Sequence, residues 1–239
     1  MKVLVIDVGG TNVKILASNR QDPIKIPSGR SMTPQEMTRK VLEEAQGWTY
    51  DVVSIGYPGI VVRGRPLLEP ANLGSGWVQF SYARAFGRPV KMINDAAMQA
   101  IGSYEGGVML FLGLGTGLGS ALIADGVLEA LEIAHMPYRK GKTFEDYLGM
   151  RGLERLGKRR WREHVGHVIT MLERALSADY VVVGGGNARL LKRLPKGVRR
   201  GDNSQAFVGG ERIWKNPTLV PAAMLVPATG RRAGKRRSR

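Results

Sequence analysis

The chain has 239 residues, no cysteine and a formal net charge of +16 at pH 7. Without cysteine it forms no disulfide and offers no thiolate to a metal ion, which excludes zinc sites built on cysteine. It holds no apolar run of the ~20 residues that span a bilayer and no signal-like segment at its amino terminus. We therefore expect a cytoplasmic protein that does not enter membranes. Because a strand candidate already begins at residue 3, we also expect no amino-terminal DNA-binding module.

The positive charge is unevenly distributed. The last ten residues, GRRAGKRRSR, include six Lys or Arg, which predicts a disordered basic tail at residues 230–239 with weak contact to nucleic acid. The other basic runs lie at residues 151–162 and 189–200. A field of this sign attracts polyanions, and a solvated basic surface and a specific polyanion site are both open interpretations.

In the first half of the chain, residues 2–10, 12–18 and 23–28 predict three strands joined as hairpins. Residues 33–46 begin with Thr-Pro and repeat apolar residues at helical spacing, which predicts a helix. Strands follow at 51–56 and 88–94, and the second leads directly into a helical pattern at 95–104. This junction places Asn94 and Asp95 at the start of a helix.

The second half repeats this plan. Residues 108–117 and 118–125 predict two strands joined by a glycine-rich turn, and two such hairpins indicate two lobes, at residues 1–105 and 106–229. Helices are predicted at 161–176, at 187–194 after the strand 180–186, and at 216–226, and the last could return to the first lobe.

Three glycine-rich segments each follow an apolar strand: DVGGTN at 7–12, GLGTGLG at 113–119 and VVVGGGNA at 181–188. Such turns can direct backbone N–H groups at a phosphate, although each one singly could be an ordinary hairpin turn. Neither a G-x-G-x-x-G segment before a helix nor a G-x-x-x-x-G-K-S/T segment occurs. The three together favour phosphate binding.

With YPG, ANLGSGW and INDAAMQAIG, these segments resemble the successive motifs of the ROK sugar kinases over residues 3–194. LEIAHMPY with the downstream EDY, and the lack of a zinc-binding cysteine motif, are most similar to the polyphosphate-dependent glucokinases. The resemblance implies an α/β, two-lobed actin-like fold with the active site between the lobes. It also implies a homodimeric hexose kinase of glucokinase type that uses Mg²⁺, with polyphosphate or ATP as donor and no zinc.

The same resemblance assigns roles to individual residues. Asp95 matches the general base, which must lie within hydrogen-bond reach of the attacking sugar hydroxyl. Four residues match positions that bind sugar hydroxyls: Asn72, Asn94, Glu132 and His135.

The donor side is assigned in the same way. Asp7 matches a carboxylate that faces Mg²⁺ through water. The residues implied around the transferring phosphoryl group are Gly9, Gly10, Thr11 and Lys14. Those implied to hold the donor from the second lobe are Gly115, Thr116 and Gly117, followed by Gly184, Gly185 and Gly186.

Other interpretations stay open for several residues. Asp95 could simply cap its helix, and His135 could be a buried structural histidine. His164 and His167 are interpreted as structural residues on the outer face of the long helix. Ala134 stands where the family commonly has glycine, and the region after residue 200 matches poorly.

At the level of function, the alternative is a non-catalytic, sugar-responsive or nucleic-acid-binding protein on the same fold. The identity of the hexose and the choice between the two donors are left open.

Overall fold

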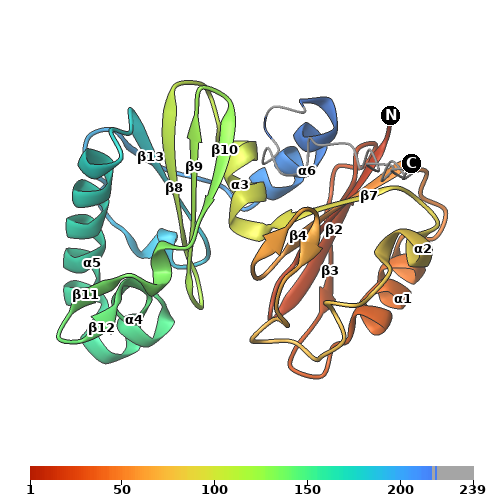
Figure 1. The fold of residues 1–239 in the computed structure, drawn as a ribbon, viewed down its shortest axis with the longest axis horizontal. Helices are drawn as coiled ribbons and strands as arrows, with labels where there is room; N and C mark the ends of the chain where they lie inside the picture. Colours follow the sequence, from red (N-terminus) through yellow and green to blue (C-terminus); the bar gives the residue numbers. More distant parts are fainter. Residues whose placement is uncertain (217–218, 220–239) are drawn as a thin grey trace, which may run out of the picture.

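The computed structural model describes residues 1–216 and 219, so the basic tail and nearly all of the helix predicted at 216–226 lie outside the described residues. Two lobes lie side by side (Figure 1), and each is built on one five-stranded sheet. No helix in the described part of the chain is long and apolar enough to cross a membrane.

The first lobe contains the sheet β3-β2-β1-β4-β7. Its strands are β1 (Val3–Val8), β2 (Asn12–Ala17), β3 (Ile24–Pro27), β4 (Val52–Tyr57) and β7 (Val90–Asn94). The first three are antiparallel hairpin strands, as predicted, whereas β4 and β7 run parallel to β1. Because parallel strands end at the same edge of a sheet, the carboxyl ends of β1 and β7 bring Asp7 and Asn94 to one edge.

The remaining elements of this lobe are α1 (Pro34–Glu44), β5 (Val61–Val62), β6 (Arg65–Pro66) and α2 (Tyr82–Phe86). Helix α1 begins where the sequence predicted, because the side chain of Thr33 accepts a hydrogen bond from the Glu36 amide and Pro34 takes the first helical position.

The second lobe repeats this topology in the sheet β10-β9-β8-β13-β14. Its strands are β8 (Val108–Leu114), β9 (Leu118–Ala124), β10 (Val127–Leu131), β13 (Tyr180–Gly184) and β14 (Val198–Arg200). Between β10 and β13 lie η1 (Ile133–His135), β11 (Pro137–Arg139), β12 (Lys142–Thr143), α4 (Phe144–Leu148) and α5 (Met150–Ala175). A 3₁₀ turn, η2 (Ala188–Leu190), follows β13.

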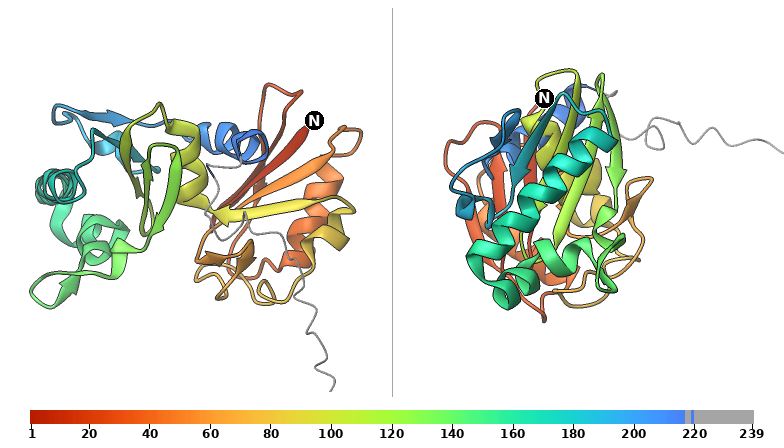
Figure 2. Two further views of the ribbon diagram at one scale, coloured as in Figure 1. Left: turned by 45° about the horizontal axis from the view of Figure 1, so that its top comes forward. Right: turned by 90° about the vertical axis from the view of Figure 1, so that its left-hand side faces the viewer.

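Helices α3 (Asp95–Ser103) and α6 (Gln205–Lys215) lie between the two sheets, whereas α1 and α5 cover the outer faces (Figure 1). The strand residues alternate between these layers. Val5 packs in the central cluster with α3 and α6, while its neighbour Leu4 packs with α1. In the second sheet Phe111 faces α3 and Leu110 faces α5. Figure 2 shows α5 lying across the face of the second sheet that is turned away from the first lobe.

Helix α6, which the sequence analysis missed, packs closely on α3 because glycines remove the side chains between them. A methyl group on Gly209 would overlap the Met98 carbonyl oxygen, and one on Gly102 would overlap the Gln205 carbonyl oxygen. Arg212 then donates to three carbonyl oxygens near the end of α3, those of Ile101, Gly102 and Tyr104. Helix α6 therefore packs on α3, β1 and β4, although it follows the second lobe in the sequence.

Two predicted helices differ from the structure. The helix predicted at 187–194 is wrong, because only η2 forms there. The Leu190 carbonyl accepts from Arg162 Nε and the Leu191 carbonyl from Arg200, so these oxygens serve arginines instead of a helix. The helix predicted at 161–176 starts earlier, at Met150, with a break at Gly157 where φ is 71°.

Candidate active site

The turn between β1 and β2 forms one wall of the site. Asp7 lies opposite Lys14 in the strand register, and Lys14 Nζ lies 3.2 Å from Asp7 Oδ2. The Gly9 amide donates to the Asn12 carbonyl at 3.1 Å, which closes the turn. Burial raises the pKa of Asp7, and the Lys14 ammonium opposes that rise. The structure thus gathers the predicted phosphate residues Gly9, Gly10, Thr11 and Lys14 on one hairpin.

Asn72 lies against this hairpin although it comes from a distant loop. A methyl group on Gly10 would lie 2.9 Å from the Cβ atom of Asn72, so only a glycine allows this approach. The predicted sugar-binding residue Asn72 and the predicted phosphate loop are therefore in contact.

Asn94 and Asp95 lie at the start of α3, as predicted, and make different contacts there. Asn94 Oδ1 accepts from the Ala97 amide at 3.1 Å and its Nδ2 donates to the Gly59 carbonyl at 3.1 Å. Asn94 is therefore the helix cap, and the capping interpretation of Asp95 is not needed.

The carboxyl of Asp95 is electrostatically perturbed. Burial raises its pKa to about 7, and the nearby Asp7 carboxylate adds to the rise, as does Glu132 to a smaller extent. The amide of Ala96, which donates to Asp95 Oδ1 at 2.8 Å, opposes this rise. A carboxyl that changes its protonation state near neutrality is suited to take up a proton at physiological pH.

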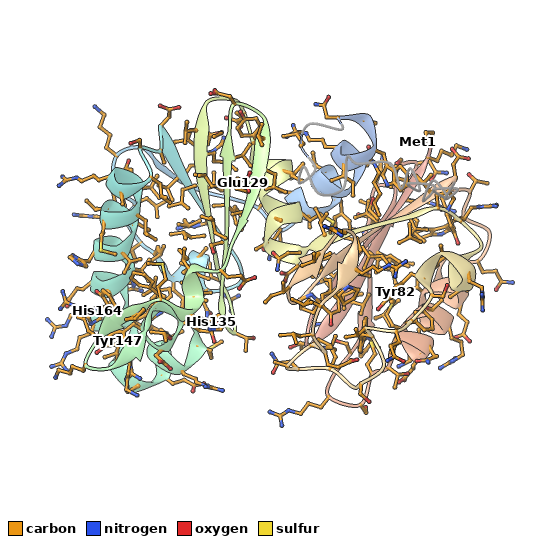
Figure 3. All side chains as sticks on the ribbon, in the orientation of Figure 1. Met1, Tyr82, Glu129, His135, Tyr147 and His164 are labelled. Carbon is orange, nitrogen blue, oxygen red and sulfur yellow. The ribbon has the colours of Figure 1, made fainter. Side chains whose placement is uncertain are left out.

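Glu132 and His135 lie in the second lobe, where Glu132 precedes the η1 turn that ends at His135, which is labelled in Figure 3. Both are exposed, so the structure does not bury His135 as a structural histidine would be. Burial raises the pKa of Glu132, and His135 opposes the rise. Ala134, the departure from the family pattern, is 3% exposed and packs in the core of the lobe, so its methyl group does not project into solvent.

The second and third glycine loops lie side by side. Asn187 Nδ2 donates to the Gly115 carbonyl at 3.1 Å, and the Met150 amide donates to the Thr116 carbonyl at 3.0 Å. Gly185 has φ of 80°, and a methyl group there would overlap the Leu114 backbone. Only glycine accepts this conformation and this approach.

Two supporting residues were missing from the sequence prediction. Glu145 Oε2 accepts from the Leu118 amide at 3.1 Å and lies against Gly117, and Asn187 is buried under the same loops. The capping box of Thr143 and Asp146 predicts a helix start beside Glu145, but no local signal reveals the contact with residue 118.

The two lobes meet beside Asp95. A methyl group on Gly119 of β9 would lie 2.6 Å from the Cβ atom of Ala96, the residue that follows Asp95. The start of α3 therefore lies between the phosphate hairpin of the first lobe and the donor-loop hairpin of the second.

His164 and His167 take no part in this site. His164 Nδ1 lies 3.1 Å from the Tyr138 hydroxyl and its ring packs on Tyr147 (Figure 3). The environment lowers the pKa of His164, chiefly through burial. His164 is half-buried and His167 is exposed, so only His167 matches the prediction of an outer-face position.

The ligands that the site offers to a metal fit a magnesium ion that keeps most of its water. Among the described residues no three His, Asp or Glu side chains are close enough to form a metal cage. Mg²⁺ instead binds through one or two carboxylates, waters and substrate phosphates, and Asp7 offers one such carboxylate beside the phosphate hairpin.

No family model matches the chain. Among curated proteins it is 26% identical over 211 residues to the polyphosphate glucokinase of Mycobacterium leprae, which covers 79% of this chain and 64% of that protein. It is 27% identical over 206 residues to the polyphosphate glucokinase of Mycobacterium tuberculosis strain CDC 1551, covering 77% of each. The chain thus spans just under two thirds of the first of these relatives.

Solved structures agree with these relatives. The inorganic polyphosphate/ATP-glucomannokinase of Arthrobacter sp. strain KM superposes with a TM-score of 0.76 at 25% identity, over 90% of this chain and 99% of that one. This chain is therefore similar to polyphosphate-using sugar kinases. A ROK family glucokinase from Streptomyces griseus shares the fold with a TM-score of 0.72 at 15% identity, over 89% and 99% of the two chains. The predicted actin-like fold and the resemblance to ROK sugar kinases are confirmed, and the relatives support a hexose kinase.

Proposed function

We propose that this chain transfers a phosphoryl group from polyphosphate or ATP to the 6-hydroxyl of glucose or a related hexose, with Asp95 as general base. The observation that carries the proposal is the Asp95 carboxyl at the start of α3, next to Asp7, with its pKa raised to about 7. A general base is most effective when its pKa lies near the working pH.

The chemistry follows from this arrangement. The sugar would bind against the side chains of Asn72, Asn94, Glu132 and His135. The ionised Asp95 accepts the proton of the 6-hydroxyl while the sugar oxygen attacks the terminal phosphorus of the donor. A new P–O bond forms to the sugar, and the P–O bond to the rest of the donor breaks and leaves ADP or a shortened polyphosphate.

The two glycine hairpins would position the phosphate groups and neutralise their charge. Phosphoryl transfer leaves the protein mainly to position the reactants and to neutralise charge. Lys14 and the backbone N–H groups of Gly10 and Thr11 would face the transferring group, and the loop at Thr116 would hold the donor. When bound, Mg²⁺ held through water by Asp7 would neutralise phosphate charge.

For the donor, we expect polyphosphate to serve at least as well as ATP. Relatives named for polyphosphate use support this expectation. The chain also presents Lys158, Arg159 and Arg160, exposed on α5, with no ion pair or hydrogen bond to another side chain in the part of the molecule that is described. Because α5 lies on the outer face of its lobe (Figure 2), a donor would reach this basic run only if it extended beyond the site. A long polyanion can do so, whereas ATP is short.

A coupled assay that detects hexose 6-phosphate tests the function, with glucose or mannose as acceptor and ATP or polyphosphate as donor. Turnover with at least one pair is the expected result. No turnover with any pair would refute the proposal, and nucleic-acid binding that survives high salt would then favour the non-catalytic alternative. We also propose a homodimer, which light scattering of the purified chain would test by its mass.

A further inference from the structure

The loop that carries Asn72 has no regular secondary structure, yet it must hold a sugar-binding side chain in place. We call residues 69–78 the Asn72 loop. A loop outside helices and sheets is ordinarily the most mobile part of a domain, so its geometry depends on specific hydrogen bonds. Those bonds identify a residue that the assigned site does not include.

Glu69 closes the Asn72 loop on itself. One carboxylate oxygen, Oε2, accepts from the Trp77 amide at 3.0 Å, and the other, Oε1, accepts from the Val78 amide at 3.2 Å. The two ends of the loop are thereby joined through a single carboxylate. Hydrogen bonds to an ionised acceptor are stronger than those between neutral groups.

Two buried tyrosines fix the same ends to the core of the lobe. The Tyr57 hydroxyl donates to the Leu68 carbonyl at 2.8 Å, and the Tyr82 hydroxyl donates to the Trp77 carbonyl at 3.0 Å. Burial raises the pKa of both tyrosines, and the Glu69 carboxylate adds to each rise, so both hydroxyls keep their protons. Asn72 itself lies between these ends and touches the phosphate hairpin at Gly10.

From this geometry we infer that Glu69 is a positioning residue, which holds Asn72 against the phosphate hairpin so that it can bind the sugar. The inference rests on the proposed function, because it assumes that Asn72 contacts the acceptor. It concerns how the acceptor is held and not the donor, because both of these hydrogen bonds of Glu69 are made inside the Asn72 loop.

Glu69→Gln is the direct test, because the amide keeps the shape of the side chain but its NH₂ group cannot accept a hydrogen bond. Losing one of the two bonds should raise the KM for glucose about 10-fold. The KM for the donor should stay within about 2-fold of the parent value. Glu44→Gln, an exposed glutamate at the end of α1, is the matched control for the loss of one charge in this lobe and should change neither KM.

A double-mutant cycle separates positioning from a general loss of structure. If Glu69 acts through Asn72, Glu69→Gln should have little further effect on the KM for glucose once Asn72→Ala is present. Additive effects in the double variant, or equal rises in the KM values for glucose and donor, would overturn the inference.

Amide hydrogen exchange provides a readout that does not depend on turnover. In the parent chain glucose should slow exchange in the Asn72 loop, and in Glu69→Gln the amides of Trp77 and Val78 should exchange faster than in the parent. Unchanged exchange at these two amides would also overturn the inference. Absence of turnover in the parent would refute the proposed function, whereas normal parent turnover with an unaltered Glu69→Gln variant would refute the role of Glu69 alone.

Discussion

Replacing Asp95 with asparagine removes the proposed base while keeping its size and its ability to accept from the Ala96 amide. We expect kcat to fall by about 10²- to 10⁴-fold, the usual contribution of general-base catalysis. The KM for the sugar should change little, because the amide can still hydrogen-bond a hydroxyl. In the parent chain kcat/KM should rise with pH around a midpoint near 7, because kcat/KM reports the free protein and only the ionised carboxyl can accept the proton.

The same substitution should change stability in a pH-dependent way. The pKa of Asp95 is raised in the folded chain from its ordinary 3.8 to about 7, so its contribution to stability is full below pH 3.8 and is lost as pH rises through about 7. At 1.36 kcal/mol per pKa unit this loss is about 4 kcal/mol, and partial exposure of the side chain reduces it to ~2 kcal/mol. Asparagine never ionises, so Asp95→Asn should be more stable than the parent at pH 8 by ~2–4 kcal/mol.

Urea unfolding at pH 8 and pH 5 measures this difference, and the gain should shrink at the lower pH. Asp22→Asn, at an exposed loop position, serves as the control and should give no such gain. If Asp95→Asn keeps the turnover of the parent, Asp95 is not the base. If it loses turnover but gains no stability at pH 8, the electrostatic account of Asp95 is wrong.

Two further substitutions test the helix packing and the donor surface. Gly209→Ala should cost ~1–3 kcal/mol in unfolding free energy, because the new methyl group overlaps the backbone of α3. Gly166→Ala, where a methyl group in α5 would meet open space, should instead gain ~0.5–1 kcal/mol, and equal effects of the two in urea unfolding would contradict the packing argument. Replacing Lys158, Arg159 and Arg160 together with glutamine should raise the KM for long polyphosphate and weaken its salt dependence while the KM for ATP stays nearly constant. Parallel rises for both donors would show that this basic run does not select polyphosphate.

The spacing of apolar residues and glycines along the chain was sufficient to predict several strands and the start of α3. Alternating apolar residues bounded by glycine predicted β1, β2, β8 and β9, and the Asn94–Asp95 junction followed from a strand that runs directly into a helical repeat. The assignment of roles at that junction came from family resemblance, and the chemistry of Asp95 became visible only from the burial and neighbours that the fold provides.

The features that the sequence did not predict depend on contacts between residues far apart in the chain. Helix α6 was missed because Gly209 and Gly210 lower helix propensity, and its stability comes from close packing on α3 and on Val5 of β1. The helix predicted at 187–194 fails because arginines distant in sequence bind its carbonyl groups. The contact between Glu145 and the Leu118 amide joins residues 27 positions apart, which no sequence spacing reveals.

The most direct test of the central claim compares the parent chain and Asp95→Asn for glucose 6-phosphate formation at pH 8, with polyphosphate and with ATP. The account predicts turnover by the parent with at least one donor and a loss of about 10²-fold or more in the variant, with little change in the KM for glucose. Turnover of equal rate in the two proteins, or none in the parent with either donor, would contradict it.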